Sequence, residues 1–420
     1  MKIFKFGGAS VKDAQSIRNV VEIIRKHAPE PALVVISALG KTTNRLEALA
    51  SAFFENRADT QALFEAVRDD HRAILKELIP EDYAAYAEPT EALFSRLERY
   101  LQQEPSDNFD FEYDQIVSFG ELFSTRMVSA YLEKVHFPHE WMDARRLVRT
   151  DNHYREGEVD WVKTERNIQK HLQERYPNGL DRLLLTQGFI AGTPEKFSIT
   201  LGREGSDYSA AIFAHALQAE SVTIWKDVDG LLNADPKVFP NAVKLEQIPY
   251  REAIELAYYG ASVIHPKTIK PLQNKNIPLY VKSFLHPEES GSVIHSFKEY
   301  RILPCYIRKT NQVLLSIFSK DFSFIAEENL STIFALFALF NVKINVMQNS
   351  AISFSVCVDA KDTLPQLIEE LQTEFVVRYN ENVELLSIRH YAADSLAPYV
   401  KGRKVMMEQR SRSMLQVVLK

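Results

Sequence analysis

Cysteines and long apolar runs are scarce in this chain. The two cysteines, Cys305 and Cys357, lie far apart in the sequence and match neither a metal-ligand spacing nor a disulfide framework. No apolar run is long enough to cross a bilayer, and the first residues lack the apolar core of a signal peptide. We therefore expect a cytoplasmic protein that does not associate with membranes.

An excess of basic residues is also missing. Lys and Arg total 50 against 56 Asp and Glu, which gives a formal net charge of -6. Domains that bind nucleic acid carry clustered Lys and Arg, and no basic tract stands out here. The charge therefore predicts no nucleic-acid partner, although it allows an anionic ligand where positive groups gather locally.

What is present is the composition of a globular protein with more than one domain. Hydrophobic residues make up 45% of the chain and charged residues 25%. A chain of 420 residues is too long for one ordinary hydrophobic core.

The N-terminal part alternates between strand and helix patterns. Residues 2–6 (KIFKF) predict a strand that ends at Gly7 and Gly8, and residues 17–27 have apolar side chains at helical spacing. Residues 33–36 are apolar on both faces, as in a buried strand of a parallel sheet. Further patterns predict strands within 181–192, 221–230 and 277–284, and helices within 46–102. This alternation predicts an α/β fold.

The pattern changes at about residues 295–303. Strand, helix, strand, strand, helix and strand are then predicted at residues 313–318, 330–340, 343–347, 352–358, 364–374 and 383–388. This is the order of a ferredoxin-like domain. The last residues, SMLQVVLK, predict one more strand.

Three glycine-bearing loops follow predicted strands or lie close to one. They are Gly7-Gly8, residues 37–44 (SALGKTTN) and residues 200–211 (TLGREGSDYSAA). Loops at the carboxyl ends of parallel strands share one edge of the sheet, and glycine lets backbone amides approach an anion. The loops therefore predict a polyphosphate site. Neither standard nucleotide-binding fingerprint is present.

Other candidate residues have both a functional and a structural interpretation. Glu121 is expected at a turn before a helix, where an acid also favours the helix dipole. Arg203, Ser206 and Asp207 lie between glycines ahead of an alanine-rich stretch and suit a carboxylate or phosphate, or a plain surface loop. The acidic segment 225–236 also fits a solvated turn.

Six ordered motifs together resemble the aspartate kinase family of the amino acid kinase superfamily. They are KFGGAS, VVISALGKTTN, SFGELFST, TLGREGSDYSAA, WKDVDGLLNADP and YYGASVIHP. The C-terminal part resembles the ACT regulatory region of that family. The resemblance implies a mostly parallel eight-stranded sheet between helical layers over residues 1–297. It also implies an ACT region over residues 298–420, with one full module at about 304–390 and a shortened second module.

The resemblance implies a reaction as well. ATP, with Mg²⁺, would phosphorylate the side-chain carboxylate of L-aspartate to give 4-phospho-L-aspartate, the first step towards lysine, threonine and methionine. A carboxylate with a reference pKa of about 3.9 is already ionised at neutral pH, so no general base is needed. Mg²⁺ held mainly by phosphates and waters would need no cluster of protein ligands, and none is visible in the sequence.

The family's site residues can be carried over position by position. The catalytic pair would be Lys5 and Asp207. The ATP-binding residues would be Lys5, Gly7, Gly8, Ser10, Lys226, Asp227 and Lys237, together with the helix start at Pro266. The residues binding L-aspartate would be Ser37, Thr43, Glu121, Arg203 and Ser206. In that set Glu121 would bind the ammonium group, and Arg203 a carboxylate.

Three positions depart from the family pattern. Ala9 replaces the threonine of KFGGTS, Ser262 replaces a lysine that reaches the nucleotide phosphates, and Lys226 replaces a threonine. We hypothesise that Lys226 supplies the positive charge missing at Ser262.

The ACT resemblance implies feedback regulation by lysine or threonine, and a homodimer formed through this region. The expected effector pocket comprises Phe324, Ile325, Met347, Gln348, Asn349, Ser350 and Ile352, which could instead be a structural dimer face. Two other functions stay open: a catalytically silent amino acid sensor, or a related kinase acting on glutamate or N-acetylglutamate. An N-acetylated substrate would not need the carboxylate of Glu121.

Overall fold

The computed structural model describes residues 1–28, 31–261, 264–321 and 323–420 of the chain. These described residues divide into two compact units. The N-terminal unit takes in the described residues up to 231, then 245–254, and those from 264 to 300. The C-terminal unit takes in residues 232–244, 255–261 and those described from 301 to 420.

Within the described residues, the sheet of the N-terminal unit has eight strands in the order β10-β12-β11-β7-β1-β2-β4-β3. They are β1 (Lys2–Phe6), β2 (Ala32–Ile36), β3 (His139–Met142), β4 (Leu183–Gln187), β7 (Ser221–Lys226), β10 (Gln247–Pro249), β11 (Leu279–Ser283) and β12 (Ser292–His295). Neighbouring strands are parallel except for the pair β11 and β12. The predicted α/β fold with a mostly parallel sheet is therefore confirmed.

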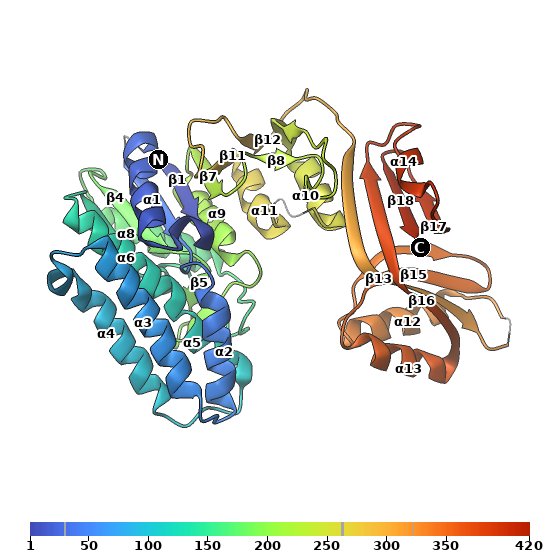
Figure 1. Ribbon diagram of the computed structural model, residues 1–420, viewed down its shortest axis with the longest axis horizontal. Helices are drawn as coiled ribbons and strands as arrows, with labels where there is room; N and C mark the ends of the chain where they lie inside the picture. The colour runs from blue at the N-terminus through green and yellow to red at the C-terminus, as the bar shows by residue number, and fades with distance from the viewer. Residues whose placement is uncertain (29–30, 262–263, 322) are drawn as a thin grey trace. The chain divides into compact units, whose positions relative to one another are not determined.

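Helices lie between these strands in the sequence (Figure 1). They are the 3-10 turn η1 (Gly8–Val11), α1 (Ala14–His27), α2 (Thr42–Phe54), α3 (Thr60–Leu78), α4 (Tyr83–Leu101), α5 (Phe109–Val117), α6 (Phe119–Lys134), α7 (Ala144–Leu147), α8 (Trp161–Arg175), α9 (Gly205–Leu217), α10 (Tyr250–Tyr259) and α11 (Pro266–Lys275). Short strand pairs are formed by β5 (Ile190–Gly192) with β6 (Ser198–Thr200), and by β8 (Leu231–Leu232) with β9 (Lys244–Leu245).

The alternation along β1 decides which side chains face which helices. Phe4 and Phe6 belong to a buried cluster with residues of α1, α3 and α6. Successive side chains of a strand point to opposite faces, so Ile3 and Lys5 face the other side of the sheet. Helix α9 contacts β1, β2 and β7 and contributes Asp207, which pairs with Lys5. This places Lys5 next to α9.

The C-terminal unit is built on an antiparallel sheet. Its elements are β13 (Cys305–Ser319), α12 (Glu327–Leu339), β14 (Ile344–Asn349), β15 (Ser353–Asp359), α13 (Leu364–Glu374), β16 (Phe375–Arg389), α14 (Ala397–Val400), β17 (Val405–Arg410) and β18 (Met414–Leu419). The strand order is β14-β15-β13-β16-β18-β17. The order β14-β15-β13-β16 confirms the predicted ferredoxin-like arrangement.

Two strands of this sheet are longer than the sequence pattern predicts. β13 and β16 each have 15 residues, and register shifts near Gln312 interrupt their pairing. Beyond that point, β16 pairs with β18, and β18 with β17. The predicted strand at residues 383–388 is thus only the second half of β16. β17 was not predicted, and the short strands β3, at one edge of the N-terminal sheet, and β12, between β10 and β11, were also missed.

The C-terminal unit includes two segments that precede it in the sequence. Residues 232–244 and 255–261 group with it, whereas the sequence boundary placed both in the catalytic region. Phe239 packs against the rings of Tyr306 and Tyr399 at centroid distances of 5.5 and 5.4 Å. Asn233 O accepts a hydrogen bond from Tyr306 N at 2.8 Å. Apolar packing and backbone pairing therefore tie the first segment to the C-terminal sheet.

None of the helices in the described ranges is both long and apolar enough to span a membrane.

Candidate active site

The loop after β1 and the loop after β2 lie against each other. Ser37 N donates a hydrogen bond to Phe6 O at 3.1 Å, and Gly40 N donates to Gly8 O at 3.0 Å. A Cβ atom on Gly8 would lie 2.8 Å from Gly40 O and 2.9 Å from Ala38 O. Such distances are too short for a side chain, so Gly8 is required for the close approach of the two loops.

Lys5, Asp207 and Lys226 form a chain of ion pairs. Lys5 comes from β1, Asp207 from the first turn of α9, and Lys226 is the last residue of β7. Lys5 Nζ lies 2.6 Å from Asp207 Oδ1, and Lys226 Nζ lies 3.6 Å from Asp207 Oδ2. Lys5 and Asp207 are buried, whereas Lys226 is partly exposed. The fold thus joins residues that are far apart in the sequence.

This chain of ion pairs carries one net positive charge. Burial raises the pKa of Asp207, but the ammonium groups of Lys5 and Lys226 outweigh burial and hold that pKa below its ordinary value. Asp207 is therefore ionised at neutral pH. A Cβ atom on Gly7 would lie 3.4 Å from Lys5 Nζ, so the ammonium group is next to the glycine loop. A positive group beside backbone amides suits a phosphate ligand.

Glu121 is a buried carboxyl group with one oxygen left without a partner. It lies in the first turn of α6, inside the helix rather than at the turn before it. Its Oε1 accepts a hydrogen bond from Ala38 N at 3.2 Å, and its Oε2 has no hydrogen-bond partner among the described residues. Burial raises the pKa of Glu121 to about 8, a shift that Ala38 N and Lys5 partly oppose. The free oxygen suits a cationic donor from a ligand.

The glycine that follows β4 also belongs to this region, although the sequence did not single it out. Gly188 N donates to Ile36 O at 2.9 Å. A Cβ atom on Gly188 would lie 2.6 Å from Ser206 Cβ and 2.8 Å from Ser206 Cα. The next residue, Phe189, has a φ of 64° and donates its N–H to Ser209 Oγ at 2.9 Å. A glycine inside the stretch predicted to contain a strand, residues 181–192, was the available signal.

Other predicted site residues lie on the same loops with fewer contacts. Ser10 is buried in η1, and its Oγ has no partner among the residues described. Ser37 directly follows β2, Thr43 lies in the first turn of α2, and both are partly buried. Ser206, buried in the first turn of α9, precedes Asp207. These four hydroxyl groups come from three sequence segments: the loop after β1, the stretch from β2 to α2, and the start of α9.

Three predicted residues are not brought into this contact network. Arg203 is exposed in the turn before α9, and Asp227 is exposed directly after β7. Lys237 is exposed and belongs to the C-terminal unit, where its N–H donates to Asp235 Oδ1 at 2.9 Å. Ser262, which the sequence predicts to stand where the family has a lysine, lies outside the described residues. Helix α11 begins at Pro266 as predicted.

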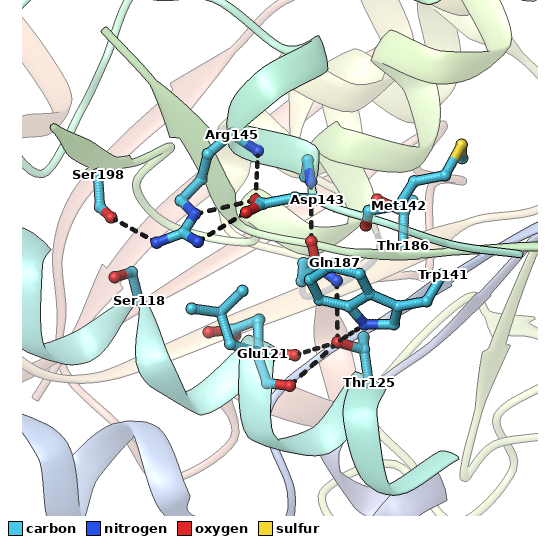
Figure 2. Close-up of polar contacts among 12 residues, drawn as sticks. Ser118, Glu121, Thr125, Trp141, Met142, Asp143, Arg145, Thr186, Gln187 and Ser198 are labelled. Atoms are coloured by element: carbon cyan, nitrogen blue, oxygen red, sulfur yellow. Dashed lines mark hydrogen bonds and ion pairs between the residues drawn. The ribbon is translucent and has the colours of Figure 1, made fainter. Parts of the chain in front are cut away.

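The helix that carries Glu121 is anchored by a buried polar network (Figure 2). Thr125 Oγ1 donates to Glu121 O at 2.8 Å. The same oxygen accepts hydrogen bonds from Trp141 Nε1 at 3.0 Å and from Gln187 Nε2 at 2.9 Å. Because Gln187 ends β4 and Trp141 lies in β3, this network fixes the first turns of α6 to the sheet.

The predicted effector residues gather at one edge of the C-terminal sheet. β14 is an edge strand and contains Met347, Gln348 and Asn349. Ile325 N donates to Ala351 O at 2.9 Å, which brings the 324–325 segment to the turn that contains Ser350 and Ile352. Ile325 is buried, and the other predicted residues of this set are exposed.

No group of three or more His, Cys, Asp or Glu side chains among the described residues could hold a metal ion. Near the glycine loops, the carboxylate of Asp207 is already paired with two ammonium groups.

The chain matches the amino acid kinase family over residues 1–283. It is 30% identical over 402 residues to lysine-sensitive aspartokinase 3 of Escherichia coli (strain K12), which covers 92% of this chain and 86% of that protein. It is 35% identical over 300 residues to the chloroplastic bifunctional aspartokinase/homoserine dehydrogenase 1 of Zea mays, which covers 70% of this chain and 32% of that protein. The chain spans about a third of the length of these plant relatives.

Solved structures of E. coli aspartokinase III are similar over the whole chain. The R-state complex with aspartate and ADP has a TM-score of 0.83 at 27% identity, and covers 100% of this chain and 96% of that chain. The T-state complex with lysine and aspartate has a TM-score of 0.83 at 28% identity, and covers 100% and 95%.

Proposed function

Because this chain belongs to the aspartokinases of the amino acid kinase family, we propose that it transfers the γ-phosphoryl group of ATP to the side-chain carboxylate of L-aspartate. The product is 4-phospho-L-aspartate. The observation that carries this proposal is the pairing of a phosphate-type site, made by the glycine loops and Lys5, with a buried carboxyl group, Glu121, that has a free oxygen.

In this mechanism the two lysines neutralise charge on the transferring group. Lys5 lies beside Gly7, where it would contact the phosphoryl oxygens, and Asp207 holds its ammonium group in place. Lys226, on the other oxygen of Asp207, adds the charge that Ser262 does not carry. Phosphoryl transfer needs mainly positioning and charge neutralisation. The aspartate carboxylate is already ionised at neutral pH and needs no general base.

The remaining residues bind the substrates. The free oxygen of Glu121 would accept the α-ammonium group of aspartate, and Arg203 a carboxylate. Ser37, Thr43 and Ser206 supply hydroxyl groups around it. Gly7, Gly8 and Ser10 would face the phosphates of MgATP, and Asp227 the adenosine. Mg²⁺ would arrive with the nucleotide, held mainly by phosphates and waters.

The C-terminal unit would regulate this activity. One similar solved structure is the T-state complex of E. coli aspartokinase III with lysine and aspartate. By analogy, lysine or threonine would bind at the β14 edge, through the set Phe324, Ile325, Met347, Gln348, Asn349, Ser350 and Ile352. Two copies of the chain would pair there, since β14 is a sheet edge that leaves backbone groups free for a second strand.

Hydroxylamine trapping of the acyl phosphate tests the proposed reaction. Hydroxamate should form only when ATP and L-aspartate are both present, and it should be absent with Lys5→Met. Glutamate and N-acetylglutamate should give none. Hydroxamate from either of these instead would assign a different kinase substrate, and amino acid binding without turnover would assign a sensor. Adding lysine, threonine and methionine in turn identifies the effector.

A further inference from the structure

A basic hollow lies in the N-terminal unit, and none of its lining residues belongs to the glycine loops. Its volume is about 460 Å³. The charged lining residues come from α4, from α7 and its flanks, and from the turn between β5 and β6: Arg96, Asp143, Arg145, Arg146, Arg149 and Lys196. Five of these six side chains are cationic.

Most of this positive charge has no counter-ion in the hollow. Asp143 is the one carboxylate among the described lining residues, and it is occupied by Arg145, with Nε at 2.9 Å from Oδ1 and Nη2 at 2.7 Å from Oδ2. Burial, followed by repulsion from Arg145, lowers the pKa of Arg96 below its ordinary value, an effect that Asp143 opposes. An anion in the hollow would relieve that repulsion.

The backbone around the hollow is tightly packed. A Cβ atom on Gly192 would lie 2.2 Å from Arg145 O, so β5 approaches α7 as closely as only glycine permits. Gly192 N donates to Val148 O at 3.0 Å. Two of the guanidinium groups are also positioned: Arg149 Nη1 donates to Thr193 O at 2.8 Å, and Arg145 Nη1 donates to Ser198 Oγ at 3.2 Å. Arg145 and Arg149 are therefore held in place before a ligand binds, which reduces the entropy cost of binding.

The chemistry of the lining selects a ligand class. A guanidinium group presents paired N–H donors that match two oxygens of a phosphate. The volume is in the range of small-molecule sites. Arg146, Lys196 and Arg96 are exposed enough for a solute to reach. We propose that this hollow is a second anion site, for a small molecule carrying one or more phosphate groups, and that its occupancy is coupled to Glu121.

The coupling follows from a continuous chain of hydrogen bonds (Figure 2). Asp143, in the hollow, caps α7, which starts at Ala144. Ala144 N donates to Gln187 Oε1 at 2.8 Å, and Gln187 Nε2 donates to Thr125 Oγ1 at 2.9 Å. Thr125 Oγ1 in turn donates to Glu121 O at 2.8 Å. A ligand that shifts Asp143 or Arg145 would therefore act on the turn of α6 that carries Glu121. The coupling rests on the proposed function, whereas the anion site does not.

Calorimetric titration of the full chain with pyrophosphate, at fixed ionic strength, tests the site. The glycine loops would also bind pyrophosphate, so the titration is repeated with Lys5→Met, in which binding at the hollow should persist. In that background, Arg146→Gln combined with Lys196→Gln should weaken binding at least roughly tenfold, because charge-assisted contacts are lost. Equal affinity with and without these two substitutions would overturn the site.

A control double substitution distinguishes a specific site from a general effect of net charge on binding. Arg25→Gln combined with Lys26→Gln removes the same two charges from exposed positions on α1. It should leave pyrophosphate affinity within about twofold of the parent protein. An equal loss of affinity in this control and in the Arg146 and Lys196 double variant would contradict the proposal. Because the side chains changed in the two double variants are all exposed, both variants should give the same thermal melting curve as the parent protein. Arg149→Gln alone should also weaken pyrophosphate binding, which tests the site independently of the double variant.

The coupling has its own readout. At saturating MgATP and fixed free Mg²⁺, pyrophosphate should change the KM for aspartate in the wild type and in the α1 control pair. In the Arg146 and Lys196 double variant, pyrophosphate should leave the KM for aspartate unchanged. An identical response in both pairs would refute the coupling. A protein without aspartate turnover would refute the proposed function, yet still show pyrophosphate binding in the hollow.

Discussion

Glu121 shows how burial makes one side chain responsive to a ligand. Its pKa of about 8 means that the ligand-free protein holds this carboxyl group largely protonated at neutral pH. An ammonium ligand favours the charged form, so binding would expel the proton. The apparent KM for aspartate should therefore fall as pH rises towards about 8 and level off above it.

Glu121→Gln tests this dependence. The substitution should raise the KM for aspartate by roughly 10- to 100-fold, since a charged hydrogen bond is lost, and should remove the pH dependence. Glu112→Gln is the matched control. Glu112 is equally buried, but its oxygens accept hydrogen bonds from Tyr100 Oη and Ser106 N. A wild-type pH profile in Glu121→Gln would contradict the assignment.

The same raised pKa makes a prediction about stability. Between the ordinary value of 4.5 and about 8, the folded protein keeps the proton that the unfolded chain releases. The unfolded chain then binds fewer protons, so the free energy of unfolding falls as pH rises through this window. Ligand-free Glu121→Gln should lose less stability than the wild type between about pH 5 and pH 8, measured by urea denaturation. If the free energy of unfolding changed with pH in the same way in the wild type and in Glu121→Gln, the raised pKa of Glu121 would be contradicted.

Lys226 is a predicted departure from the family pattern, and its ammonium group lies 3.6 Å from Asp207 Oδ2. Lys226→Met should lower kcat/KM for ATP at least roughly tenfold, because one cation leaves the phosphate site, while Lys5→Met should cost more. Lys282→Met is the control, since Lys282 lies on the adjacent strand with its ammonium group over the ring of Trp225. Unchanged ATP kinetics in Lys226→Met would exclude the role proposed for Lys226.

At the scale of elements, the β1 and β2 loops depend on Gly8. Gly8→Ala should lower the free energy of unfolding by about 1–3 kcal/mol, because its Cβ would press against two carbonyl oxygens. Gly7→Ala is the matched comparison, since its Cβ would meet only Lys5 Nζ, at 3.4 Å, and stability should hardly change. Denaturant titration of both variants measures their free energies of unfolding and tests this difference. Equal losses would show that the loop contact is unimportant.

Elements with strong patterns were predictable, and the short strands β3 and β12 were not. The apolar run of β2 and the periodic helices follow from local sequence. β3 (HEWM) and β12 (SVIH) contain too few residues for a pattern, and their pairing partners stabilise them. The length of β16 likewise comes from pairing with β13 and β18.

At the scale of the whole molecule, the loop after β7 belongs to both units. It starts at Lys226 in the N-terminal unit, and its continuation from residue 232 groups with the C-terminal unit. The proposed nucleotide-binding segment therefore continues along the chain directly into residues of the C-terminal unit.

The β14 edge carries a prediction on assembly and regulation. Met347 and Ile352 are 48% and 43% exposed, and Met347→Lys combined with Ile352→Lys should abolish feedback inhibition and shift dimers to monomers. Activity without effector should stay within about twofold of the wild type. Val405→Lys, on the opposite edge strand β17, is the control. Sedimentation velocity that still shows dimers would contradict pairing at this edge.

The amino-acid sequence alone was sufficient for the α/β class, the ferredoxin-like tail and the family, because these follow from local periodicity and from short ordered motifs. Lys5, Asp207 and Glu121 were found in the same way. Their roles remain predictions, because a sequence motif identifies residues and does not show what they bind or catalyse.

Contacts between distant segments could not be read from the sequence. The 3.6 Å approach of Lys226 to Asp207, the free oxygen of Glu121, the packing of Gly188 on Ser206 and the basic hollow all depend on how strands and helices pack. Electrostatic interaction depends on distance and burial, and both are properties of the folded chain. The tertiary structure therefore sets the charges and pKa values of this protein, on residues that its sequence supplies.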